Sequence, residues 1–161
     1  MNVQNKFEQP GSGGDNVADF DGTVEMDGDT SVEGTKQTSN ISFAAAPGAA
    51  NVCEVTISAL DGTNDLTARV QNLKVWLSDA ATGAGQSGTT ASGTVTAKAA
   101  SGTVLDTLTA KQSLIVQTLA TGVFILEITD TAKTGFYICV ENPTNGKIEV
   151  SDQLVTGDYG A

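Results

Sequence analysis

The chain has 161 residues, of which 19 are acidic and 8 basic, and its formal net charge at pH 7 is -11. Such a charge repels nucleic acids and anionic membranes, so neither is an expected partner. Histidine is absent, which excludes His-ligated metal sites and the Ser-His-Asp and Cys-His catalytic arrangements. The 18 glycines and a charged fraction of only 17% favour a β-rich structural or binding protein. We expect no enzymatic activity, no catalytic residue, no cofactor and no metal site.

Residues 1–50 differ in composition from the rest of the chain. They contain 8 acidic and 2 basic residues, a net charge of -6, and their apolar residues occur singly. Turn-forming residues recur, for example at 10–14 and at Pro47-Gly48. Because so few apolar groups could hardly offset the ordering entropy, we interpret 1–50 as an extended acidic arm.

The arm contains three candidate apolar anchors, Phe7, Phe20 and Phe43. We expect them to hold the arm against neighbouring chains, assisted by strand pairing at an exposed sheet edge. The alternative is an arm that folds back on its own domain as short strands, such as Gly22–Met26 and Asn40–Ala44. The acidic clusters at 19–22 and 27–29 lack the ligand spacing of a calcium loop and indicate solvated turns.

Residues 51–161 alternate between strand and turn patterns. Cys53, Val55 and Ile57 alternate with polar residues, as in a half-buried strand. After the turn at Asp61-Gly62, the segment 70–77 places Leu73, Val75 and Leu77 on one face, which turns Trp76 to the other.

Further strands follow in the second half of the chain. The phrase Ala-Ser-Gly-Thr-Val occurs at 91–95 and again at 100–104, and predicts two short adjacent strands. Apolar runs predict strands at 114–116, 123–128, 136–140 and 148–155, with Asn145-Gly146 as a hairpin turn. The pattern predicts an all-β sandwich of about eight strands over residues 51–161.

The order Cys53, Trp76 and then Tyr137-x-Cys139 resembles the pattern of immunoglobulin-type sandwiches. The resemblance implies an Ig-like fold in which Tyr137 makes the tyrosine corner. It also implies that Cys53 and Cys139 lie near one another in the core, as a thiol pair or a disulfide. The spacing between the cysteines is long for that family, Lys133 replaces the expected acid, and Trp76 has outward parity. A jelly roll is the alternative fold.

The runs 75–85 (VWLSDAATGAG), 121–131 (TGVFILEITDT) and 150–152 (VSD) resemble small β-rich virion proteins of tailed bacteriophages. The resemblance implies a decoration or cement protein on the outer capsid surface. Its expected partners are the major capsid protein and copies of itself. The N-terminus lacks a basic segment followed by an apolar run, so we expect assembly in the host cytoplasm. A tail or collar accessory protein and a carbohydrate-binding adhesion module are the alternatives.

Trp76 is the one tryptophan of the chain and has two interpretations. It is either a partly buried strand residue or an exposed anchor at a subunit contact. In an adhesion module it would be the obvious aromatic platform for a sugar ring.

Overall fold

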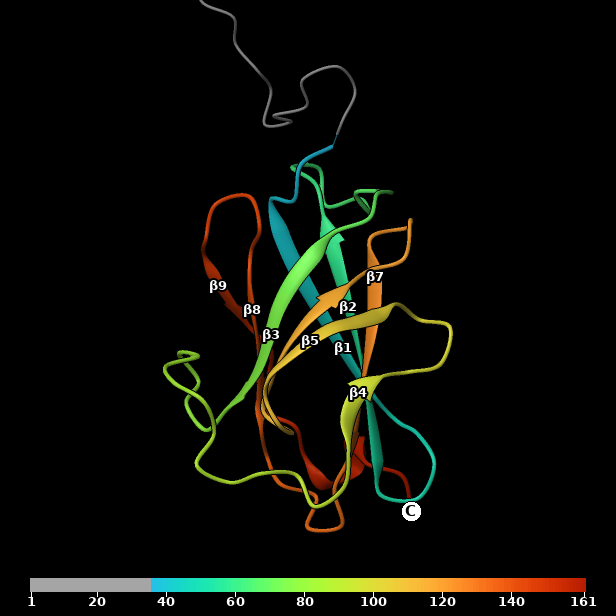
Figure 1. The fold of residues 1–161 in the computed structure, drawn as a ribbon, viewed down its shortest axis with the longest axis vertical. Coiled ribbons are helices and arrows are strands. Elements are labelled where there is room, and N and C mark those ends of the chain that lie inside the picture. Colours follow the sequence, from blue (N-terminus) through green and yellow to red (C-terminus); the bar gives the residue numbers. More distant parts are fainter. Residues whose placement is uncertain (1–35) are drawn as a thin grey trace, which may run out of the picture.

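The computed structural model describes residues 36–161, which form nine strands and one short 3-10 helix (Figure 1). The strands are β1 (Asn40–Pro47), β2 (Val52–Leu60), β3 (Asn72–Ser78), β4 (Val95–Ala97), β5 (Thr103–Thr109), β6 (Ser113–Gln117), β7 (Val123–Thr129), β8 (Tyr137–Glu141) and β9 (Ile148–Val150), followed by helix η1 (Thr156–Asp158). The prediction of an all-β fold is confirmed for this part of the chain.

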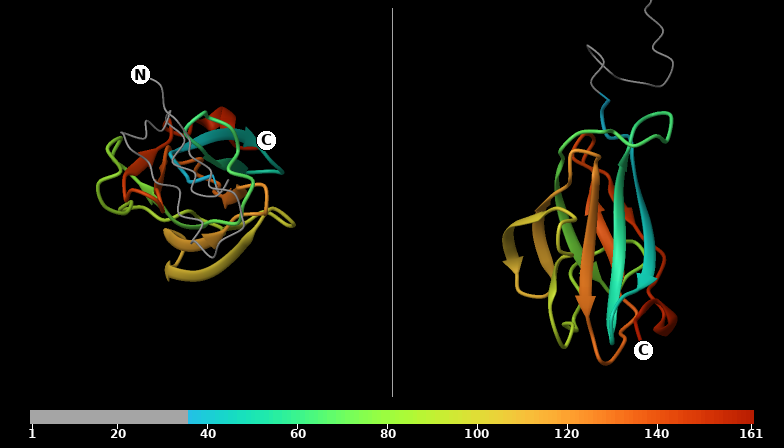
Figure 2. Two further views of the ribbon diagram at one scale, coloured as in Figure 1. Left: turned by 90° about the horizontal axis from the view of Figure 1, so that it is seen from above. Right: turned by 90° about the vertical axis from the view of Figure 1, so that its right-hand side faces the viewer.

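The strands form two antiparallel sheets that pack face to face as a sandwich (Figure 2). The strand orders are β1-β2-β7-β4 and β5-β6-β3-β8-β9. Within them, β1-β2-β7 and β3-β8-β9 reproduce the A-B-E and C-F-G pairings of immunoglobulin-like sandwiches. The departure is the segment β4–β6, which adds a short strand to one sheet and a hairpin to the other. The fold is therefore Ig-like, and the jelly-roll alternative is not adopted.

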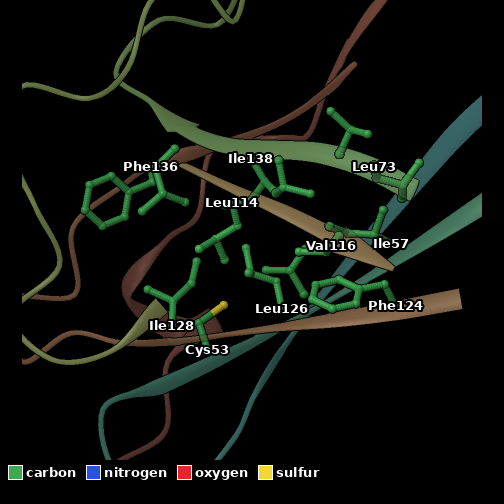
Figure 3. Close-up of a cluster of buried hydrophobic side chains, with 14 of the residues drawn as sticks. Cys53, Ile57, Leu73, Leu114, Val116, Phe124, Leu126, Ile128, Phe136 and Ile138 are labelled. Atoms are coloured by element: carbon green, nitrogen blue, oxygen red, sulfur yellow. The ribbon is translucent and has the colours of Figure 1, made fainter. Parts of the chain in front are cut away.

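Alternation of apolar and polar residues builds the core between the sheets. Every second residue of the central strands points inward, because successive strand side chains face opposite sides of a sheet. Each fully buried Leu, Ile or Phe contributes about 1.5–3 kcal/mol, so this layer is the main source of stability. The core includes Cys53, Val55, Ile57, Leu73, Val75, Leu77, Leu114, Val116, Phe124, Leu126, Ile128, Phe136 and Ile138 (Figure 3).

The sandwich begins before residue 51. Residues 40–47, which the composition assigned to the acidic arm, form β1 and pair with β2 over its length. Ile41 is buried and the partly buried Phe43 packs against the core, so β1 is part of the domain. This is the fold-back arrangement considered for Asn40–Ala44, whereas Gly22–Met26 lies outside the described residues.

The nine-residue repeat does not form two adjacent strands, because β4 and β5 belong to different sheets. Instead, the glycine of each copy packs against β7. A Cβ atom on Gly93 would lie 2.7 Å from Thr129 Cβ, and one on Gly102 would lie 2.5 Å from Phe124 Cδ2. At both glycines of the repeat, Gly93 and Gly102, the backbone therefore lies too close to β7 to leave room for a side chain.

The C-terminal residues close the end of the sandwich opposite to residue 36 (Figure 1). Gly160 donates its N–H to the Val52 carbonyl at 2.9 Å. The buried Tyr159 donates its hydroxyl to the Thr134 carbonyl at 2.7 Å. Tyr159, rather than Tyr137, is thus the tyrosine whose hydroxyl ties two backbone segments, since Tyr137 makes no side-chain hydrogen bond within residues 36–161. The tyrosine-corner assignment of Tyr137 was wrong.

Replacing Gly102 by alanine should lower the free energy of unfolding by about 3 kcal/mol or more. Its φ of 115° is rare for residues with a side chain, and the new methyl would lie 2.6 Å from the Gln117 carbonyl oxygen. Urea unfolding measures the loss. Gly146→Ala is the matched control, because Gly146 also has a positive φ, 71°, but has no atom within 4 Å of its Cβ position. Equal losses in the two variants would contradict the close contact.

Candidate interaction surface

Trp76 lies on the outer face of the five-stranded sheet, as its parity predicted, but it is covered. Its side chain is only 8% exposed, because the loop after β3 folds over it. The indole Nε1–H donates to the Gly83 carbonyl at 3.2 Å, and Lys74 Nζ lies 5.7 Å from the ring centroid. Trp76 therefore packs within its own domain. This corrects its assignment as an exposed interface anchor.

Asp79 holds the covering loop in place. Its carboxylate accepts hydrogen bonds from the Ser87 hydroxyl at 2.5 Å and from the Gly88 N–H at 2.7 Å. These two bonds lower the pKa of Asp79. At the tip of the loop, a Cβ atom on Gly83 would lie 2.9 Å from Ile148 Cγ2. The loop and the outer face of the sheet thus form a second, smaller apolar layer.

The two cysteines are free thiols and lie in different sheets, Cys53 on β2 of the four-stranded sheet and Cys139 on β8 of the five-stranded sheet. Cys53 belongs to the core between the sheets, whereas Cys139 does not. Ile138 and Val140 fill the core on either side of Cys139, so its Sγ points outward, where it lies 3.2 Å from the Cβ position of Gly83. The expectation of a neighbouring core pair or a disulfide is therefore wrong, because strand alternation sends the two side chains to different layers.

Of the three predicted phenylalanine anchors, only Phe43 lies within the described residues. It is half-buried on β1 and packs against the core of its own sandwich. Phe43 therefore packs within its own domain, which corrects its assignment as an anchor against a neighbouring chain. Phe7 and Phe20 lie outside the described residues.

The buried carboxylate of Asp61 fixes the position of the chain just before β1. Its Oδ1 accepts hydrogen bonds from the backbone N–H groups of Thr63 at 2.9 Å and Asp65 at 3.0 Å. Its Oδ2 lies 2.5 Å from the Nζ atom of Lys36. The lysine, followed by the Thr63 hydroxyl, which donates to Oδ1 at 2.7 Å, and by these backbone hydrogen bonds, holds the pKa of Asp61 well below its usual range.

Asp130 has a similar structural role in the loop after β7. Its carboxylate accepts backbone hydrogen bonds from Thr134 at 2.8 Å and from Ser92 at 3.1 Å. Burial tends to raise the pKa of Asp130, but these hydrogen bonds outweigh it and the pKa is lowered. Within residues 36–161, each of the three carboxylates with a lowered pKa, Asp61, Asp79 and Asp130, is thus engaged in fixing a loop.

Within residues 36–161, no three Cys, Asp or Glu side chains converge as a metal site. The same part of the chain contains no helix with the length and apolarity that crossing a membrane requires.

The sheet edges differ strongly in their capacity to pair with another strand. The edge strands β4 and β9 have only 3 residues each. The edge strand β5 has two register shifts, one on each side of the pair Asp106–Thr107, and such bulges hinder edge pairing. By contrast, β1 has 8 residues in unbroken register and contains no charged side chain. Among the described strands, β1 therefore offers the edge best suited to pairing.

The register shows which backbone groups of β1 are available. Gly48 donates its N–H to the Val52 carbonyl at 2.9 Å, and Ala59 donates its N–H to the Gly122 carbonyl at 2.9 Å. In an antiparallel pair, every second residue of a strand hydrogen-bonds to the neighbouring strand, and the residues between them direct their backbone groups away from it. The even-numbered residues of β1 therefore bond to β2, while the odd-numbered residues of β2 bond to β7. The N–H and C=O groups directed away from β2 belong to Ile41, Phe43 and Ala45.

A hollow of about 220 Å³ lies beside the edge of β1. The segment 151–158 forms its other side, and Figure 2 shows β1 at the side of the molecule away from the hairpin β5–β6. One lining residue, Val55, belongs to the core, so the hollow reaches the interior where the sandwich is open. It is lined by Phe43, Ala45, Val55, Ser151, Asp152, Gln153, Leu154 and Asp158.

A second hollow of about 310 Å³ lies on the outer face of the five-stranded sheet. Its lining includes Lys74 and Glu141, whose half-exposed side chains form an ion pair of 3.8 Å. Because this pair is in contact with water, it adds little binding energy. The hollow beside β1 differs in that it adjoins unpaired backbone groups.

The chain matches no known protein-family model, no curated protein and no solved structure.

Sequence reasoning gave Asn40–Ala44 as a strand only in the fold-back alternative, and it did not identify residues 40–47 as a free sheet edge. The available signal was the phrase Asn-Ile-Ser-Phe-Ala-Ala-Ala-Pro, an uncharged segment next to an acidic one. Its alternation, with Ile41 and Phe43 on one side, is the pattern of a strand. Its position at the sheet edge could not be predicted, because it depends on which strands pair and the sequence does not show this.

Stability should fall as the pH drops below about 4. A carboxyl group whose pKa is lower in the folded chain contributes stability above its unfolded pKa, and loses it as the pH falls toward the folded value. Asp61, Asp79 and Asp130 all have pKa values lowered by folding. Urea midpoints measured at several pH values between about 7 and 3 test this expectation.

Asp61→Asn should flatten that pH dependence, because the variant lacks the carboxylate whose protonation breaks the ion pair with Lys36. The control is Asp65→Asn, whose carboxyl group is 75% exposed and lies 4.0 Å from the same Nζ atom. It should leave the profile unchanged. A wild-type acid profile in Asp61→Asn would show that this ion pair is not linked to folding.

Neither thiol should react with Ellman's reagent in the native protein near pH 8. Burial raises the pKa of Cys53 to about 12 and that of Cys139 to about 11, so neither forms the reactive thiolate. In denaturant without reductant, both free cysteines should react. A denatured chain with no reactive thiol would instead reveal a disulfide.

Proposed function

We propose that this chain is a non-enzymatic structural protein of a virion, a decoration protein on the outer capsid surface of a tailed bacteriophage. The observation that carries the proposal is that the perturbed ionisable groups have structural roles, whereas the edge strand β1 is available for contact. The carboxylates with perturbed pKa values fix loops and the thiols are buried, whereas β1 presents a regular, uncharged edge for contact. Together with the resemblance to phage virion proteins, this supports a function through surface contact.

The charge supports the outer side of a particle. Packaged DNA is densely anionic, and a chain of net charge -11 would be repelled within the Debye length of about 8–10 Å. An outward position avoids this repulsion. The argument applies to a decoration protein and equally to a tail or collar accessory protein.

The adhesion module receives less support from the aromatic side chains. Sugar rings commonly stack on exposed aromatic faces, but the candidate for this, Trp76, lies beneath its own loop. Each of the six aromatic residues in 36–161 is buried or half-buried. A capsid surface protein is therefore the better proposal.

Quantifying the protein in purified particles tests the proposal. A decoration protein should be present at a copy number that scales with the capsid subunits, and immunogold labelling should lie over the head. A few copies at the tail would replace the proposal by the tail or collar role. Absence from particles, combined with specific binding on a glycan array, would replace it by the adhesion module.

A further inference from the structure

We propose that the free edge of β1 binds an extended, lysine- or arginine-rich segment of a partner protein as an additional strand of the four-stranded sheet. The inference rests on the proposed function only for the identity of the protein that carries the segment.

The edge itself supplies the affinity. Ile41, Phe43 and Ala45 direct their backbone groups away from β2, which is the only strand paired with β1 in the described structure. An extended peptide can satisfy these groups by β-strand addition, in which main-chain hydrogen bonds provide the affinity. Because β1 runs for 8 residues without a register shift, an added strand of similar length can remain in register.

The hollow beside β1 selects the charge of the segment. Asp152 and Asp158 line it, and neither forms an ion pair with a described residue. Side chains of the added strand that face the hollow would lie near these two carboxylates. A basic side chain there gains a favourable charge interaction, and an acidic one is repelled.

The same charge argues against two other occupants. Residues 1–35 contain eight acidic residues and a single lysine, so the chain's own N-terminal segment would bring negative charge to a negative hollow. A second copy would bring a net charge of -11. A basic segment from a different protein avoids both repulsions.

The outer face of β1 carries small side chains. Ser42, Ala44 and Ala46 are exposed on that face and leave room next to them for a neighbouring strand's side chains. Cross-strand neighbours stabilise a sheet when they pack together. The expected segment therefore alternates basic residues, toward the hollow, with β-branched residues toward the outer face.

Titration of the isotope-labelled full chain with a synthetic peptide tests the proposal. The peptide has 8 residues, the length of β1, and alternates lysine with valine. We expect it to shift and protect the amide signals of Ile41, Phe43 and Ala45, and to bind about tenfold more weakly when salt rises from about 0.05 to about 0.5 M. A peptide with glutamate in place of lysine should bind at least about tenfold more weakly.

Two variants form a matched pair. Ala45→Arg places a cation at the hollow and should weaken binding of the lysine peptide by about tenfold or more. Ala99→Arg adds the same charge at an exposed position after β4, at the opposite edge of the four-stranded sheet, and should change binding by less than about threefold. Circular dichroism and urea unfolding confirm that both variants fold.

Several results would overturn the proposal. These are no binding, equal binding of the lysine and glutamate peptides, or equal effects of the two arginine variants. Protection of the three amides in dilute free protein would show that the chain covers its own edge. Protection that appears only at high concentration would show that a second copy does. Because the assay uses no particles, it can fail while the protein is still found on capsids, and the reverse also holds.

Discussion

The strict alternation of inward and outward side chains along β2, β3, β7 and β8 is the constraint on which the rest of the structure depends. It commits one residue in two to the core between the sheets, where Val75, Leu126 and Ile138 are fully buried. A shift of one residue in any of these strands would exchange its core face for its outer face. The pairing register of these strands is therefore strongly specified.

That constraint also creates the second layer of the protein. Because Leu77 and Ile138 face inward, Trp76 and Cys139 are sent to the opposite face of the same sheet, where they are register partners. Two such groups would otherwise be exposed to water. The loop after β3, fixed by Asp79 and pressed onto the sheet at Gly83, covers them. The residues that resembled an immunoglobulin core pair are thus divided between two separate layers.

The edge strands of the two sheets determine where this fold can pair with a strand of another molecule. A sandwich leaves unpaired backbone groups at its edge strands, and proteins protect these with short strands or bulges. Here β4 and β9 are short and β5 is bulged, whereas β1 is long, regular and uncharged. The asymmetry concentrates pairing capacity at one side of the molecule, next to Asp152 and Asp158.

The sequence by itself determined the all-β class, the core faces of the main strands and the hairpin turn at Asn145-Gly146, because these follow from local alternation and turn chemistry. Only the tertiary structure decided which strands are neighbours. It separated the two copies of the nine-residue repeat, placed residues 40–47 at an edge, and put Cys53 in the core between the sheets but Cys139 on the outer face of the five-stranded sheet. Strand pairing joins residues that are distant in the chain, and the local pattern of one strand carries no information about its partner.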